Sequence, residues 1–199
     1  MTPGTSRRRW LQAGALACCA ALAPPVRSTD ARASFYDGFK GMQLLDQSGR
    51  PLSVEALRGK VVLFNFVFTA CSTVCPVQTH ALVQLQRGLV PALRARVHLV
   101  SVSLDALGDT PRTLKAFAAR HGVDHANWSF VTGRPDDVYR LAEALWLFRD
   151  GKGRGPLEQH DTSLWLVDAQ GVLRARYAGN PPDVTRLARE LGSLAQDIG

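Results

Sequence analysis

The feature that most constrains the fold is the segment 61–68, VVLFNFVF, in which Asn65 is the one polar residue. A short continuous apolar run of this kind is typical of a central strand that is covered on both faces of its sheet. From Pro76 to about Arg87 the apolar residues change to helical spacing. Because a strand buried on both faces needs helices above and below it, the sequence predicts an α/β fold.

The rest of the chain predicts strands and helices in alternation, with polar turn signals at 46–49 and 168–171. Pro111, behind a residue with a capping side chain, begins a helix that Gly122 closes. This order of elements indicates an α/β sandwich in one domain. In chain order we expect a hairpin at 42–54, strands at 61–68, 97–104 and 128–131 with helices at 76–87, 111–122 and 134–145 after them, a hairpin at 163–177 and a last helix from Pro182.

The first 33 residues have the layout of an export signal. Three arginines, Arg7 to Arg9, precede the apolar, uncharged segment 10–23. That segment is shorter than the roughly 20 apolar residues of a membrane span, so a permanent anchor is the weaker interpretation. We expect a signal over 1–33 that is cleaved before Ser34, and a mature domain over 34–199 in the periplasm.

The type of export signal has alternatives. Segment 6–12, SRRRWLQ, is similar to a twin-arginine signal, with Trp10 where Phe is usual. An ordinary secretory signal and lipidation of Cys19 are the alternatives. Contact with a membrane is expected only through this N-terminal segment, if it is not cleaved.

The charge distribution argues against nucleic-acid binding. The net charge is +7, but five arginines and one aspartate precede Ser34. From Ser34 onward, 19 basic residues face 16 acidic ones without clustering. The mature chain therefore lacks the basic patch that nucleic-acid binding needs.

Cys71 and Cys75 are the candidate reactive residues. They are the cysteines that remain after removal of the signal, and they lie where the central strand ends and a helix begins. A helix N-terminus stabilises a thiolate, and we expect Cys75, next to Pro76, to feel this most. The pair could close a disulfide or bind one soft metal ion. A purely structural disulfide is the alternative, but so small a ring adds only about 2 kcal/mol.

The segment 68–76, FTACSTVCP, resembles the signature of the Sco/SenC family, which comprises exported, copper-binding proteins with a thioredoxin fold that serve cytochrome c oxidase assembly. The resemblance continues at 101–105 and 109–111, at 128–133, and at His160 ahead of 164–168. It implies a thioredoxin-like sandwich with a central mixed sheet flanked by helices. It also implies that Cys71, Cys75 and His160 bind copper, as Cu(I), Cu(II) or both.

The chemistry of these side chains agrees with that implication, because thiolates select Cu(I) and an imidazole completes the set. A structural zinc site is less suitable, because it would need four protein ligands and only these three can be named. Family members usually carry Asp just before the histidine, whereas Gln159 precedes His160 here and Asp161 follows it. The family pattern therefore does not say which group orients this imidazole.

The other histidines are expected to be structural, with His80 as the one rival ligand. His80 follows Cys75 by about one helical turn, but its side chain should project along the helix flank. His98 falls in a buried strand, His121 at a helix C-terminus and His125 in a loop. Asp105, Asp109 and Trp128 are expected to be turn, cap and core residues.

The basic, glycine-rich segment 149–156 is expected to be a solvated loop that leads to His160. No helix follows it, which disfavours a phosphate-binding interpretation. The family resemblance implies that this loop could swing His160 toward the cysteines.

The resemblance implies a periplasmic copper metallochaperone that delivers copper to the dinuclear copper centre of an oxidase subunit. Its expected partners are that copper-accepting subunit and a second periplasmic copper carrier or a thiol reductant. The alternative function is a thiol-disulfide oxidoreductase that uses Cys71 and Cys75 without copper on an exported partner. A thiol peroxidase with Cys71 as the peroxidatic residue is a third, poorer match.

Overall fold

The computed structural model describes residues 34–144, 147, 157 and 160–198. The predicted export signal and the segment 149–156 lie outside these residues, and both stay predictions. Within the described ranges, no helix has the length and apolar character needed to cross a membrane.

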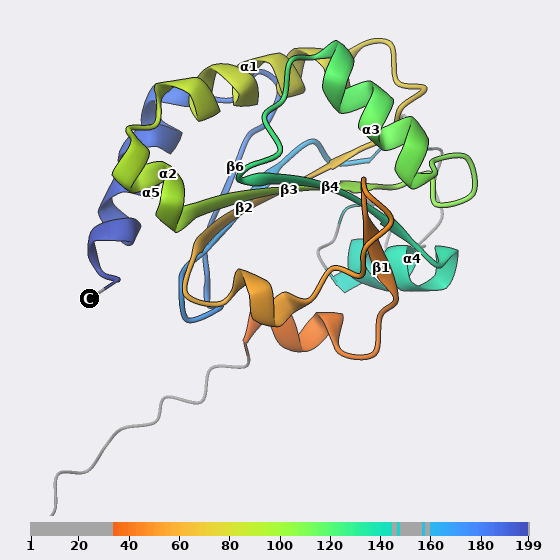
Figure 1. The fold of residues 1–199 in the computed structure, drawn as a ribbon, viewed down its shortest axis with the longest axis horizontal. Helices are drawn as coiled ribbons and strands as arrows, with labels where there is room; N and C mark the ends of the chain where they lie inside the picture. Colours follow the sequence, from red (N-terminus) through yellow and green to blue (C-terminus); the bar gives the residue numbers. More distant parts are fainter. Residues whose placement is uncertain (1–33, 145–146, 148–156, 158–159, 199) are drawn as a thin grey trace, which may run out of the picture. The chain divides into compact units, whose positions relative to one another are not determined.

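The described residues form a mixed sheet with helices on both faces (Figure 1). Its strands lie in the order β1-β4-β3-β2-β5-β6. Strands β4, β3 and β2 are parallel to one another, whereas β1, β5 and β6 each pair antiparallel with the strand that precedes them toward the centre of the sheet. The strands are β1 (Leu44–Asp46), β2 (Val61–Val67), β3 (Val97–Ser103), β4 (Trp128–Gly133), β5 (Leu164–Val167) and β6 (Leu173–Tyr177).

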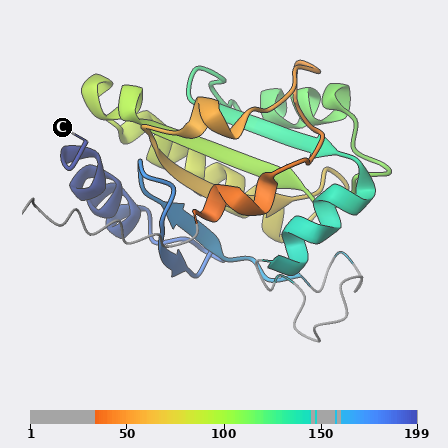
Figure 2. The ribbon, with the colours of Figure 1, turned by 90° about the horizontal axis from the view of Figure 1, so that it is seen from below.

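The helices fall into two groups, one on each face of the sheet (Figures 1 and 2). One core cluster joins the sheet to α1, α3 and α5, through residues such as Leu82, Phe117 and Leu191. The other joins the opposite face to η1 and α4, through Phe39 and Leu141. The helices are η1 (Phe35–Phe39), η2 (Val54–Leu57), α1 (Val74–Gly88), α2 (Pro91–Arg96), α3 (Pro111–Arg120), α4 (Pro135–Ala144) and α5 (Val184–Gln196), of which η1 and η2 are 3-10 helices.

Strand β2 is the centre of this sandwich, and all of its residues are buried. Alternate side chains enter opposite clusters: Leu63 and Val67 pack on the α1 side, Phe64 and Phe66 on the α4 side. Burial of each such side chain stabilises the fold by about 1.5–3 kcal/mol. The prediction of an α/β sandwich around a doubly covered strand is confirmed.

The hairpin predicted at 42–54 is wrong in its second half. Residues around the 46–49 turn make a single antiparallel bridge, between Leu45 and Pro51, and 54–57 form the 3-10 helix η2. Pro51 has no N–H to extend a strand ladder. Strand β1 pairs with β4 instead, with Leu45 opposite Thr132. The hairpin predicted at 163–177 is confirmed as β5 and β6.

The topology brings two distant segments to one edge of the sheet. Strand β5 runs antiparallel to β2, with Phe64 opposite Trp165. The residues that precede β5 therefore lie at the edge where β2 ends. His160 is among the residues that precede β5, and Cys71 is in the loop that follows β2. The fold therefore places these two candidates at the same end of neighbouring strands.

Candidate metal centre

The cysteines lie on the connection from β2 to α1. After β2 the chain turns, and the Cys71 N–H donates to the Phe68 carbonyl at 3.1 Å. Helix α1 begins at Val74, two residues before the predicted start, with Thr73 as its N-cap. Cys75 is therefore inside the first helical turn and Cys71 is outside it. Neither thiol is in a disulfide.

The two thiols have opposite environments. Cys71 is half-buried, and its Sγ accepts a hydrogen bond from the Cys75 N–H at 3.4 Å. Partial burial acts to raise the pKa of Cys71, but hydrogen bonds from the backbone of Cys75 and Thr73 outweigh it and lower the pKa. Cys75 is 2% exposed. Burial raises its pKa to about 12.

The expectation that Cys75 benefits most from the helix N-terminus is therefore wrong. Unpaired N–H groups of a first turn point out of the end of the helix, toward the residues before it. Cys71 occupies that position, whereas the Cys75 side chain packs in the core cluster beside α1. Of the two thiols, Cys71 is therefore the one whose thiolate form the local structure stabilises.

Asp109 braces the cysteine loop from the neighbouring β3–α3 connection. Its carboxylate accepts the Thr69 N–H at 3.0 Å, the Thr69 hydroxyl, and the Ser103 hydroxyl at 2.6 Å. Asp109 is 4% exposed. The prediction that Asp109 caps the following helix is wrong: Thr110 is the cap, and its hydroxyl accepts the Thr113 N–H. A contact over 40 residues of sequence has no local signal.

His160 lies four residues before β5, beside the cysteine loop. Its ring packs edge-on against Phe68, with centroids 6.1 Å apart. The His160 Nδ1–H donates to the Asp161 carbonyl at 2.7 Å. A carbonyl only accepts, so in the neutral imidazole the lone pair is on Nε2. Histidines that bind a metal through one ring nitrogen ordinarily donate the N–H of the other to a carbonyl, a carboxylate or water.

The Asp161 carboxylate does not orient the imidazole. It accepts the Ser163 N–H at 2.7 Å and pairs with Arg176. The imidazole is held instead by the main-chain carbonyl of Asp161. The change from Asp to Gln159 is thus compatible with an oriented imidazole.

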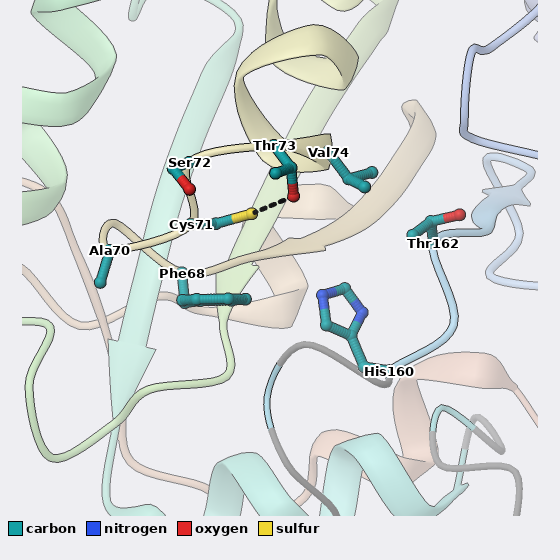
Figure 3. Close-up of a pocket in the computed structure, with 8 residues that line it drawn as sticks. All are labelled: Phe68, Ala70, Cys71, Ser72, Thr73, Val74, His160 and Thr162. Carbon is teal, nitrogen blue, oxygen red and sulfur yellow. Dashed lines mark hydrogen bonds between the residues drawn. The ribbon is translucent and has the colours of Figure 1, made fainter.

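Cys71 and His160 line one pocket of about 190 Å³ (Figure 3). One thiol, three hydroxyls and an imidazole supply its polar side chains. In the part of the chain that the structure describes, no three His, Cys, Asp or Glu residues lie close enough together to hold a metal ion. The pocket is lined by Phe68, Ala70, Cys71, Ser72, Thr73, Val74, His160 and Thr162.

The remaining histidines lie away from this pocket. His80 is exposed on α1, where its Nε2 contacts the Gln84 amide at 3.0 Å. His98 is in β3, His121 is the C-cap of α3, and His125 contacts the Trp128 carbonyl. The structure brings His160, and not His80, to the pocket that Cys71 lines.

Comparison with known proteins connects this geometry to one family. The model of the SCO1/SenC family matches residues 32–196. A SCO1 protein homolog of Bacillus subtilis is 33% identical over 137 residues, which are 67% of this chain and 70% of the relative.

Solved structures agree with the sequence match. A SCO1/SenC family lipoprotein from Bacillus anthracis is 30% identical with a TM-score of 0.65, covering 77% of this chain and 92% of that one. BsSco, described with a disulfide switch and as a member of the Sco family of cytochrome c oxidase assembly proteins, is 29% identical with a TM-score of 0.64, over 77% and 90%. Copper-bound ScoI of Bradyrhizobium japonicum shares the fold at 21% identity, TM-score 0.62, over 77% and 96%. The thioredoxin-like sandwich is confirmed.

Proposed function

The chain belongs to the SCO1/SenC family, and from that membership we propose that it binds one copper ion through Cys71, Cys75 and His160 and delivers it to the dinuclear copper centre of an oxidase subunit. Copper is then the cargo of a metallochaperone. A relative named for cytochrome c oxidase assembly and a copper-bound structure with the same fold support this proposal.

The observation that carries the proposal is the convergence of Cys71 and His160, from segments far apart in sequence, on one pocket next to Cys75. Two thiolates and an imidazole suit Cu(I), and Cu(II) can use the same groups with an added ligand. Coordination by all three donors requires the imidazole and the sulfur atoms to lie closer together than they do here. The ion would thus hold the His160 segment against the start of α1.

A second function rests on the contrast between the two thiols. The Cys71 thiolate is accessible and stabilised, as an attacking thiol must be, and the buried Cys75 follows four residues later. Cys71 would attack a disulfide of an exported partner and break its S–S bond, so that one partner sulfur leaves as a thiolate and the other is joined to Cys71 in a mixed disulfide. Cys75 as thiolate would then attack the Cys71 Sγ and release the partner's thiolate. A separate thiol reductant would restore the dithiol.

The proposed compartment is the periplasm. Support comes from the arginine-led apolar segment at the N-terminus and from a solved relative that is named a lipoprotein. The N-terminal segment would either be cleaved as a signal or be kept as an anchor. In both cases the domain 34–199 would work outside the cytoplasm and close to a membrane-bound oxidase.

The test is Cu(I) competition between a chelator and the reduced chain, followed by thermal unfolding with and without copper. Copper at about a thousand times its dissociation constant adds about 4 kcal/mol, which raises the Tm by roughly 8–16 °C. Cys71→Ser and Cys75→Ser should abolish tight binding, and His160→Ala should lose much of the rise in Tm.

His80→Ala is the matched control, because His80 is exposed on the same helix as Cys75. It should keep both the copper affinity and the rise in Tm. Full affinity in either cysteine variant, or loss of the rise in His80→Ala with retention in His160→Ala, would overturn the ligand assignment.

A further inference from the structure

Gln78 connects the cysteine helix to the histidine segment. It follows Cys75 by three residues on α1, and it is 2% exposed. Its Nε2 donates to the Thr162 carbonyl at 2.7 Å and to the Gly179 carbonyl at 3.0 Å. Thr162 follows His160 by two residues. The Gln78 amide is therefore a direct link between the two segments that supply the proposed copper ligands.

The orientation of this amide is fixed by a buried chain of hydrogen bonds. The Gln78 Oε1 accepts from the Asn65 Nδ2 at 2.8 Å, and the Asn65 Oδ1 accepts from the Ser101 hydroxyl at 2.6 Å. The Ser101 Oγ in turn accepts from the Trp128 Nε1 at 2.9 Å. Because an indole N–H can only donate, it fixes the direction of every hydrogen bond in this series, from Trp128 to the Gln78 Oε1. A flipped Gln78 amide would set its oxygen against two carbonyls.

The backbones at 162 and 179 pack closely around the amide. A side chain at Gly179 would overlap the Thr162 carbonyl and the Gln78 Nε2. The backbone at 162 and at 179 thus lies directly against the Gln78 side chain. Asn65, the polar residue within β2, holds the Gln78 amide in the orientation that contacts both carbonyls.

We propose that Gln78 is a positioning residue for copper binding: its amide fixes the Thr162 end of the His160 segment to helix α1 and so sets where the imidazole lies relative to Cys71 and Cys75. This inference rests on the proposed function. Gln78 does not line the pocket that Cys71 and His160 share, so it would act through His160 and not as a ligand. Loss of the amide would leave two inward-facing carbonyls without their donor and free the segment to shift.

The same helix offers a matched control in Gln86, which is 1% exposed. Its Nε2 donates to the Asp124 carbonyl at 2.7 Å and the Asn127 Oδ1 at 2.8 Å, and its Oε1 accepts the Asp124 N–H at 3.2 Å. Gln86 thus has the same number of hydrogen bonds as Gln78, directed at a loop far along the chain from His160. Methionine at either position keeps the volume and removes the hydrogen bonds.

The experiment compares Gln78→Met with Gln86→Met in the full chain. In the reduced, copper-free protein, the imidazole ¹H–¹⁵N signals of His160 should shift in Gln78→Met and stay unchanged in Gln86→Met. Cu(I) affinity should fall about tenfold in Gln78→Met, as for partners that orient metal ligands, and by less than about twofold in Gln86→Met. In a His160→Ala background, Gln78→Met should have no further effect on affinity.

Equal effects of the two methionine variants on the His160 signals and on affinity would overturn the inference, as would full additivity with His160→Ala. If Gln78→Met does not fold, Gln78→Asn decides in its place, because its amide is one methylene too short to reach both carbonyls. Failure of the proposed function looks different: the unmodified chain and His160→Ala would then bind Cu(I) equally, while the copper-free His160 signals still report on the link.

Discussion

The backbone N–H of Cys75 donates a hydrogen bond to the Sγ of Cys71, 3.4 Å away. One cysteine thus supports the thiolate of the other. Because Cys75 is inside the helix and buried while Cys71 is half-buried at its end, we expect the two thiols of the motif to differ in reactivity.

Alkylation should distinguish the two thiols. The pKa of Cys71 is lowered from its ordinary value and that of Cys75 is raised to about 12. Since the thiolate is the nucleophile, Cys75→Ser, which retains Cys71, should react with iodoacetamide more than about a hundredfold faster at pH 7 than Cys71→Ser. As the pH is raised, the alkylation rate of Cys75→Ser should level off at a lower pH than the alkylation rate of an ordinary free thiol. Equal rates, followed by mass spectrometry, would contradict the environments described.

Oxidation should exclude copper. Coordination needs both sulfurs as thiolates, so a Cys71–Cys75 disulfide removes two of the three proposed donors. Protein shown by mass to hold the disulfide should take up no Cu(I) from a chelator, and reduction should restore one ion per chain. Stoichiometric uptake by the oxidised protein would count against this site.

Removal of the Asp109 carboxylate should destabilise the fold. Asp109→Ala leaves the Thr69 and Ser103 donors without their acceptor in a buried setting, so the free energy of unfolding should fall by about 2–4 kcal/mol in urea titration. The control is Asp183→Ala, which removes the exposed N-cap of α5 and should cost only about 1 kcal/mol. Similar losses in the two variants would show that Asp109 does not brace the cysteine loop.

His98 should make stability fall in mild acid. Burial, with a smaller contribution from Lys60, lowers the pKa of His98 to about 4. Its Nε2 contacts the Ser129 hydroxyl, and among the described residues Nδ1 has no hydrogen-bond partner. An unfolded histidine titrates near 6.5. Between about pH 6.5 and 4 the unfolded chain binds more protons, so stability decreases as the pH falls through this window.

The measurement is urea unfolding at pH 7.5 and pH 5. The unmodified chain should lose about 1–2 kcal/mol more than His98→Gln over this interval. His80→Gln, altered at an exposed position, should behave like the unmodified chain. An equal pH dependence in His98→Gln would show that His98 is not held neutral by the fold.

The sequence by itself was sufficient for the sandwich and for the candidate residues. Segment 61–68 marks the central strand because a doubly covered strand must be apolar throughout, and the helix from Pro76 and the hairpin at 163–177 follow from local periodicity and turn residues. Cys71, Cys75 and His160 are recognisable because their chemistry and order resemble one family.

Only the tertiary structure decided how these residues are used. Helix α1 begins at Val74 and not at the predicted Pro76, and this difference decides which cysteine lies at the end of the helix. The ends of helices are set by three-dimensional packing as much as by propensity. The convergence of His160 with Cys71 follows from the antiparallel pairing of β5 with β2. The contacts of Asp109 with Thr69 and of Gln78 with Thr162 span 40 and 84 residues. No local pattern encodes such contacts, because they form only when packing brings distant backbones within hydrogen-bond distance.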